Sequence, residues 1–223
     1  MIRLAVSTAL GVLISASSVA EAHFTLMMPP PADATNDGGK GAPPCGPTTA
    51  SGVVTPAQGG HPLSISILET VGHPGHYRFA LSVNSRNELP ADPPVTTAAN
   101  GDSTGTTIQR PPIFPVLADG MFPHTTATNG VSWVGTIMLP NITCAKCTLQ
   151  IIEFMNEHGS NPGGGYFYHH CADLAITRDP ALPGDGGAPD VGGGTATGGA
   201  SGGTGGRAGT GGGNGTAGST GAS

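Results

Sequence analysis

The stretch that decides the fold runs from residue 62 to residue 83 and reads PLSISILETVGHPGHYRFALSV. Its first part, Pro62 to Leu68, alternates apolar and small polar side chains, which is typical of a strand with one buried face. Gly72-His73-Pro74-Gly75 predicts a turn, because glycine and proline favour the backbone angles of tight turns. Tyr77 to Val83 alternates again, so this stretch predicts two strands joined by a turn.

Four further segments have the composition of short strands. They are His23–Met28, Val131–Leu139, Cys147–Phe154 and Tyr166–Thr177. The segments between them are rich in glycine and proline, and residues 85–128 contain no convincing amphipathic helix. Short strands connected in this way predict an all-β protein, an immunoglobulin/fibronectin-III-like antiparallel β-sandwich with long loops.

The first 22 residues have the features of a secretory signal peptide. Arg3 provides a positive charge, Leu4 to Ile14 is apolar, and Ala20-Glu21-Ala22 fits a small-residue cleavage site. The apolar run is too short to span a bilayer. We therefore expect cleavage after Ala22, a secreted protein and no membrane span.

The end of the sequence differs in composition from the rest. From about Asp179 it consists mainly of Gly, Ala, Thr and Ser, which cannot bury enough apolar surface to fold. We expect a flexible, disordered tail or surface tether at 179–223, whereas residues 23–178 are enough for one domain with a hydrophobic core.

Charge and cysteine content limit the possible partners and the compartment. The formal net charge is −6 and only 10% of the residues are charged, which argues against nucleic acid and anionic membranes. Four cysteines in a secreted chain predict two disulfides. Because Cys147 and Cys171 fall in the last two predicted strands, we expect them to pair, which leaves Cys45 to pair with Cys144.

Cleavage after Ala22 would make His23 the first residue of the mature protein. Its free α-amine and its imidazole could then chelate one metal ion, since both nitrogens lose their protons readily to a metal at neutral pH. A site made only of nitrogen ligands prefers copper among the first-row divalent ions. The sequence therefore predicts copper at His23.

Several histidines could supply the second ligand. His73 and His76 lie in the predicted turn, where rigid strands on both sides would fix a ligand. His169 and His170 are adjacent in the last predicted strand and so point to opposite faces. The others fall in loops or after a strand: His61, His124 and His158.

Three motifs resemble those of lytic polysaccharide monooxygenases. They are His23-Phe24-Thr25-Leu26, the His-Pro-Gly turn before Tyr77-Arg78, and the segment YHHCADL at residues 168–174. The resemblance covers residues 23–178 and is strongest to the bacterial chitin- and cellulose-active type and to related secreted copper-binding families.

The resemblance implies a copper site formed by the amine and Nδ1 of His23 and by the imidazole of His73. It places Tyr168 beside the metal, with Tyr166 as the alternative. Pro74 also restricts the backbone of His73, which favours His73 over His76 as the ligand.

Further residues have expected roles near the copper. Glu69 and Glu153 are candidate carboxylates for moving protons or peroxide. His170 shares its facing with Tyr168, so it could donate a hydrogen bond to a copper-bound species or act as a third imidazole.

The implied activity is copper-dependent oxidation of an extracellular polysaccharide such as chitin or cellulose, with an external electron donor and a monomeric protein. Two alternatives remain open: a copper-binding protein without catalysis, and a carbohydrate-binding or adhesion module. The single Trp and the three Tyr all fall in predicted strands, and Phe122 is the one aromatic residue that we expect on a surface loop. This scarcity of exposed rings favours the first alternative.

Overall fold

The computed structural model of the chain describes residues 23–35, 43–46, 49–99, 103–105, 107–156 and 166–185. All of them belong to one compact unit, residues 1–192. The expected leader, most of the expected tail and His158 lie outside the described residues. Apart from one short 3-10 helix, η1 (Arg86–Glu88), the regular elements of the described part are strands, and none of its helices is long and apolar enough to cross a membrane.

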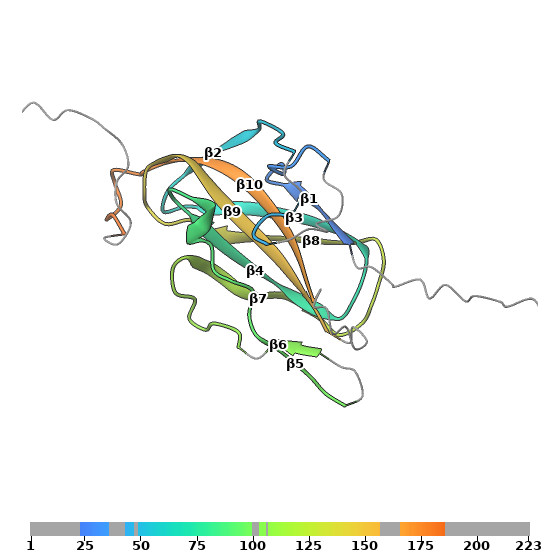
Figure 1. Ribbon diagram of the computed structural model, residues 1–223. Coiled ribbons are helices and arrows are strands. Elements are labelled where there is room, and N and C mark those ends of the chain that lie inside the picture. Colours follow the sequence, from blue (N-terminus) through green and yellow to red (C-terminus); the bar gives the residue numbers. More distant parts are fainter. Residues whose placement is uncertain are drawn as a thin grey trace, which may run out of the picture. The chain divides into compact units, whose positions relative to one another are not determined.

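Two sheets pack face to face and confirm the predicted β-sandwich (Figure 1). The larger sheet has the order β2-β10-β9-β4-β7. Its strands are β2 (Val54–Gln58), β4 (Gly75–Ser82), β7 (Val116–His124), β9 (Cys144–Met155) and β10 (Phe167–Thr177). All of its neighbours are antiparallel except β2 and β10, which run parallel.

The smaller sheet is antiparallel, with the order β1-β3-β8. Its strands are β1 (His23–Met28), β3 (Pro62–Val71) and β8 (Val131–Met138). A separate two-stranded ribbon consists of β5 (Val95–Thr97) and β6 (Ser103–Gly105).

Alternating side chains of the two sheets meet in one hydrophobic core. The stretch from residue 62 to residue 83 forms β3, a turn and β4 as predicted, and the two strands enter different sheets. Every second residue points inward, as the period of a strand requires. Fully buried members of this core include Phe24, Ile65, Ile67, Tyr77, Phe79, Leu81, Leu149 and Ile151.

Four strands were not predicted from the sequence, and β7 is the one that matters for the site. Its pairing with β4 is interrupted by register shifts, and two of its residues, Gly120 and Phe122, have positive φ angles of 66° and 50°. Bulges of this kind break the two-residue alternation on which strand prediction depends. The region therefore looked like loop, although it runs to His124 as a strand.

The predicted disulfide pairing was wrong: Cys45 is joined to Cys171, and Cys144 to Cys147. Cys147 lies opposite Leu174 in the β9–β10 register and faces the core between the sheets. Cys171 faces the other side of the same sheet, where it packs with Cys45. The strands are neighbours as expected, but the two sulfurs lie on opposite faces.

Candidate metal centre

Most of the residues singled out in the sequence meet at one end of the sandwich. The β1–β3 register places His23 opposite Val71, two residues before His73. The register of β9 with its two neighbours places Glu153 opposite both Tyr77 and Tyr168. Strands from both sheets therefore bring imidazole, carboxylate and phenol groups to one end of the core.

His23 lies beside Tyr168, in agreement with the expected neighbours of the metal. Their ring centroids are 5.9 Å apart and the planes are tilted by 42°. The carbonyl oxygen of His23 accepts a hydrogen bond of 2.9 Å from Thr70 Oγ1, which fixes the start of β1 against β3. Tyr168 is only 8% exposed, and burial is the main reason that its pKa is raised, so its hydroxyl stays protonated at neutral pH.

The turn that carries His73 is fixed on both sides by close backbone packing. A Cβ atom on Gly72 would lie 2.5 Å from the backbone of Thr128, and one on Gly75 would lie 1.9 Å from the carbonyl oxygen of Phe154. The amide of His73 donates to Glu69 Oε1 over 3.0 Å. The half-buried His73 side chain is therefore presented from a backbone that has little freedom to move.

The rival histidines have other positions. His76 packs on Phe154, with a ring distance of 5.1 Å, and its alternation with Tyr77 turns it to the outer side of the sheet. His169 also faces outward and contacts Asp92 at 2.8 Å. His170 points inward, but its Nε2 lies 3.0 Å from the carbonyl oxygen of Phe24, so it contacts the backbone next to His23.

Glu69 is a buried carboxylate whose two oxygens both accept hydrogen bonds. Trp133 Nε1 donates to Oε2 over 2.6 Å, and the amide of His73 donates to Oε1. Burial raises the pKa of Glu69. The hydrogen bonds from His124 and Trp133 lower it by a larger amount, so the pKa lies below its ordinary value. Glu69 therefore carries a negative charge inside the sandwich.

His124, a loop histidine in the sequence analysis and less favoured there than His73, lies on β7 within the site. Its Nε2 lies 3.3 Å from Glu69 Oε1 and 2.5 Å from the carbonyl oxygen of His73, and its ring stacks on Trp133 at 4.9 Å. Burial lowers the pKa of His124, but Glu69 and two backbone carbonyls raise it more, so the pKa is raised overall. Oxygens face both ring nitrogens, an arrangement that favours the imidazolium form of His124 in the absence of a metal.

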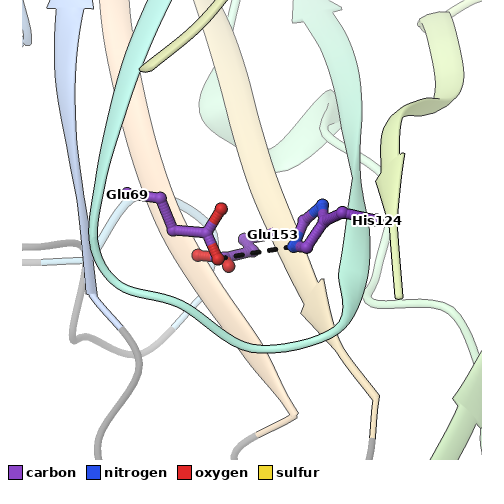
Figure 2. Close-up of side chains that lie close together, drawn as sticks. All are labelled: Glu69, His124 and Glu153. Atoms are coloured by element: carbon purple, nitrogen blue, oxygen red, sulfur yellow. Dashed lines mark ion pairs between the residues drawn. The ribbon is translucent and has the colours of Figure 1, made fainter. Parts of the chain in front are cut away.

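Glu153 is the most deeply buried of these groups, with no solvent exposure. Neither carboxylate oxygen makes a hydrogen bond of good geometry, and the same is true of the buried hydroxyl of Tyr77, although Tyr77 and Glu69 lie close enough to act on the pKa of Glu153. Burial raises the pKa of Glu153 well above its ordinary value, and the negative charge of Glu69 adds to the shift. In Figure 2 its carboxylate lies behind that of Glu69, and one ligand atom each of Glu69, His124 and Glu153 lie within 4.8 Å of one another.

Two kinds of metal-binding group therefore meet at this end of the sandwich. His23, beside Tyr168, and His73 on the neighbouring turn offer half-buried imidazoles, a nitrogen-rich set that fits copper. Deeper in the core, one ligand atom each of Glu69, His124 and Glu153 lie within 4.8 Å of one another. Only the first of these groups was predicted as a ligand set from the sequence.

Comparison with protein-family models and with curated proteins finds no match to this chain. The assignment of a function therefore depends on the geometry and chemistry of the site.

Proposed function

We propose that this is a secreted copper-dependent polysaccharide monooxygenase in which His23 and His73 hold one copper ion. The observation that carries the proposal is the convergence of His23, the His73 turn and the Tyr168 ring at one end of the sandwich. Removal of the leader would add the α-amine of His23 as a third nitrogen. The extracellular location and the bacterial type belong to the same proposal.

Copper would supply the oxidative chemistry on a polysaccharide C–H bond, with electrons from an external donor. The hydroxylation consumes dioxygen, two electrons and two protons, and it releases water. The hydroxylated carbon then eliminates the neighbouring sugar, so the glycosidic bond breaks.

The residues of the chain have the task of holding the ligands in place. Glu69 accepts a hydrogen bond from the backbone amide of His73 and so fixes that backbone. His170 contacts the Phe24 carbonyl next to His23. In this arrangement both residues act by positioning the ligands. Tyr168, protonated and nearly buried, occupies the space beside His23 and keeps water from that side.

Copper titration of the mature protein tests the ligand assignment. We expect His73→Ala to weaken copper binding by about 100-fold or more, since a lost ligand costs more than a lost neighbour of a ligand. His76→Ala is the matched control, because His76 lies in the same segment but faces the other side of the sheet, and it should bind copper like the parent. Equal losses in the two variants, measured by calorimetry and electron paramagnetic resonance, would refute the assignment.

Copper binding without polysaccharide oxidation is the second candidate, and one observation favours it. Of all the aromatic residues in the described part of the chain, only Phe114 is exposed, at 48%. Phe122, expected on the surface, instead stacks on Trp133 at 6.0 Å. A flat crystalline polysaccharide therefore meets no aromatic platform beside His23 and His73.

Product analysis separates the two candidates. Copper-loaded protein is incubated with chitin or cellulose and ascorbate, and the soluble products are examined by mass spectrometry. Oxidised oligosaccharides that disappear in His73→Ala would support the monooxygenase, whereas tight copper binding without such products would support the second candidate.

A further inference from the structure

We propose that Glu69, His124 and Glu153 form a second metal site, buried between the two sheets, that takes a divalent ion with the preferences of zinc. None of these side chains belongs to the proposed copper ligands. The inference therefore stands whether or not His23 and His73 bind copper.

The three residues come from three strands and join the two sheets. Glu69 lies on β3 of the smaller sheet, whereas His124 and Glu153 lie on β7 and β9 of the larger one. Zinc binds histidine nitrogen and carboxylate oxygen at about 2.0–2.2 Å, so two of its ligand atoms lie roughly 3–4 Å apart. The 3.3 Å from His124 Nε2 to Glu69 Oε1 agrees with that spacing, and a carboxylate oxygen of Glu153 lies within 4.8 Å of the ligand atoms of both (Figure 2).

The surrounding hydrogen bonds orient the ligands as in a metal site. His124 Nδ1 lies 2.7 Å from the carbonyl oxygen of Phe122, an acceptor that keeps a proton on Nδ1 and leaves Nε2 for the metal. A ligating histidine usually makes such a contact through its other nitrogen. Trp133 holds Oε2 of Glu69 in the same way, so Oε1 is the oxygen directed toward His124.

Two buried polar groups near the cluster lack a hydrogen bond, and a metal ion would explain both. The Glu153 carboxylate and the Tyr77 hydroxyl are fully buried and make no hydrogen bond of good geometry, although they lie close enough to each other and to Glu69 to influence one another's pKa. An unpaired polar group costs free energy when it leaves water, and an unpaired carboxylate costs the most. Glu153 and Tyr77 lie opposite each other in the β4–β9 register, so a single ion could serve both.

A dication would also balance the charges of the cluster. Two ionised glutamates and an imidazolium leave one uncompensated negative charge in the core, unless Glu153 takes up a proton. With a divalent ion, two carboxylates and a neutral imidazole, the site is neutral. The carbonyl oxygen of His73 is 2.5 Å from Nε2, which is too close for both atoms to bind one zinc ion, so this contact would open when Nε2 binds the metal.

The ligand chemistry separates this site from the copper site. Two carboxylates with one imidazole form a harder ligand set than the imidazoles of His23 and His73, and zinc binds such a mixture, usually with tetrahedral coordination. Because no water path is needed at a structural site, the ion would enter as the sheets close during folding.

Zinc loading of the full mature protein tests the inference. After exposure to zinc and dialysis, we expect elemental analysis to find one bound zinc in the His73→Ala variant, in which the proposed copper site is disabled. The same variant carrying Glu153→Gln should bind zinc about 100-fold more weakly, because it loses one charged ligand at nearly constant volume. The matched control is the His73→Ala variant carrying His61→Gln instead of Glu153→Gln. Its zinc binding should equal that of the His73→Ala variant alone.

X-ray absorption at the zinc edge keeps the test decisive if Glu153→Gln does not fold. The zinc of the His73→Ala protein should show one imidazole among oxygen ligands. Absence of zinc from this protein, zinc coordinated without histidine, or unchanged zinc binding after Glu153→Gln would each overturn the inference. The first result would mean that Glu69 and Glu153 share a proton instead of an ion.

Discussion

Trp133 has two contacts at the centre of the site that can be separated by mutation. Its ring stacks on His124 and Phe122, and its Nε1 donates a hydrogen bond to the ionised Glu69. The ring contributes packing, whereas the indole nitrogen satisfies a buried charge. Their contributions differ in kind, because packing survives a change to another aromatic ring and the hydrogen bond does not.

We expect Trp133→Phe to destabilise the protein by about 1.5–3 kcal/mol, the usual value for a hydrogen bond to a charged group that is left unsatisfied. Urea unfolding followed by circular dichroism measures the effect, since the variant has no tryptophan fluorescence. Trp133→Phe combined with Glu69→Gln provides the control. If the second substitution does not reduce the effect of the first, the hydrogen bond is not its cause.

The turn between β3 and β4 determines where His73 is presented. Gly75 opens β4 and packs directly on the backbone of Phe154 in β9, so this position has no room for a side chain. Gly52 differs, because its φ is +74° but nothing lies within 4 Å of an added Cβ. A substitution at Gly75 therefore tests a steric clash, whereas one at Gly52 tests backbone strain alone.

We predict that Gly75→Ala costs about 3 kcal/mol, at the upper end for an overpacked site, and that it also weakens copper binding by moving His73. Gly52→Ala should cost about 1 kcal/mol through its left-handed backbone alone and leave copper binding intact. Denaturant titration gives the stabilities, and calorimetry gives the copper affinities. Equal effects of the two substitutions on copper binding would contradict this account of the turn.

How far the sequence predicts these elements depends on how regular each strand is. Within residues 62–83 the alternation is regular on both sides of the Gly-His-Pro-Gly turn. It correctly predicts two strands and places His73 in the turn between them. In β7 the bulges around Gly120 and Phe122 disrupt the alternation, so His124 was assigned to a loop. The buried trio was missed for that reason, although Glu69 and Glu153 had each been noted as candidate carboxylates.

The cysteine pairing shows a second limit of prediction, since adjacency of strands does not fix which face a side chain takes. Cys45–Cys171 closes a sequence separation of 126 residues and holds the early loop against the outer face of the larger sheet. We expect replacement of both cysteines by serine to cost about 2–5 kcal/mol. Thermal unfolding of both proteins, with and without reductant, measures the stability that the disulfide contributes. If reductant destabilises the double variant as much as the parent, the Cys45–Cys171 disulfide is not the source of that stability.

At the scale of the whole molecule, the folded domain continues past the predicted end at residue 178. Asn141 Nδ2 donates to the carbonyl oxygens of Asp179, Leu182 and Pro183, and its Oδ1 accepts from the Asp179 amide. Asp179 Oδ2 also lies 2.7 Å from His61 Nε2. The composition of this segment resembles that of the tail, so only its contacts with Asn141 and His61 reveal that it belongs to the domain.

This segment should make stability depend on pH in the acid range. The hydrogen bond with His61, followed by that from the Ala181 amide, lowers the pKa of Asp179 below its ordinary 3.8. A carboxylate with a lowered pKa in the folded state stabilises that state above its unfolded pKa, and the stabilisation is lost as the pH falls through the folded pKa. The protein should therefore lose part of its stability below about pH 4 through Asp179.

Asp179→Asn should be less stable than the parent at pH 5–6, and the difference should shrink as the pH falls below about 4. Urea unfolding between pH 6 and pH 3 follows both proteins, with His61→Gln as the matched variant that removes the partner of the carboxylate. Because the pair lies near the surface, with the His61 side chain 43% exposed, solvent screens it, so the effect should be small and should weaken at high salt. A constant difference between Asp179→Asn and the parent across this range would mean that the carboxylate acts only as a hydrogen-bond acceptor, with no contribution from its charge.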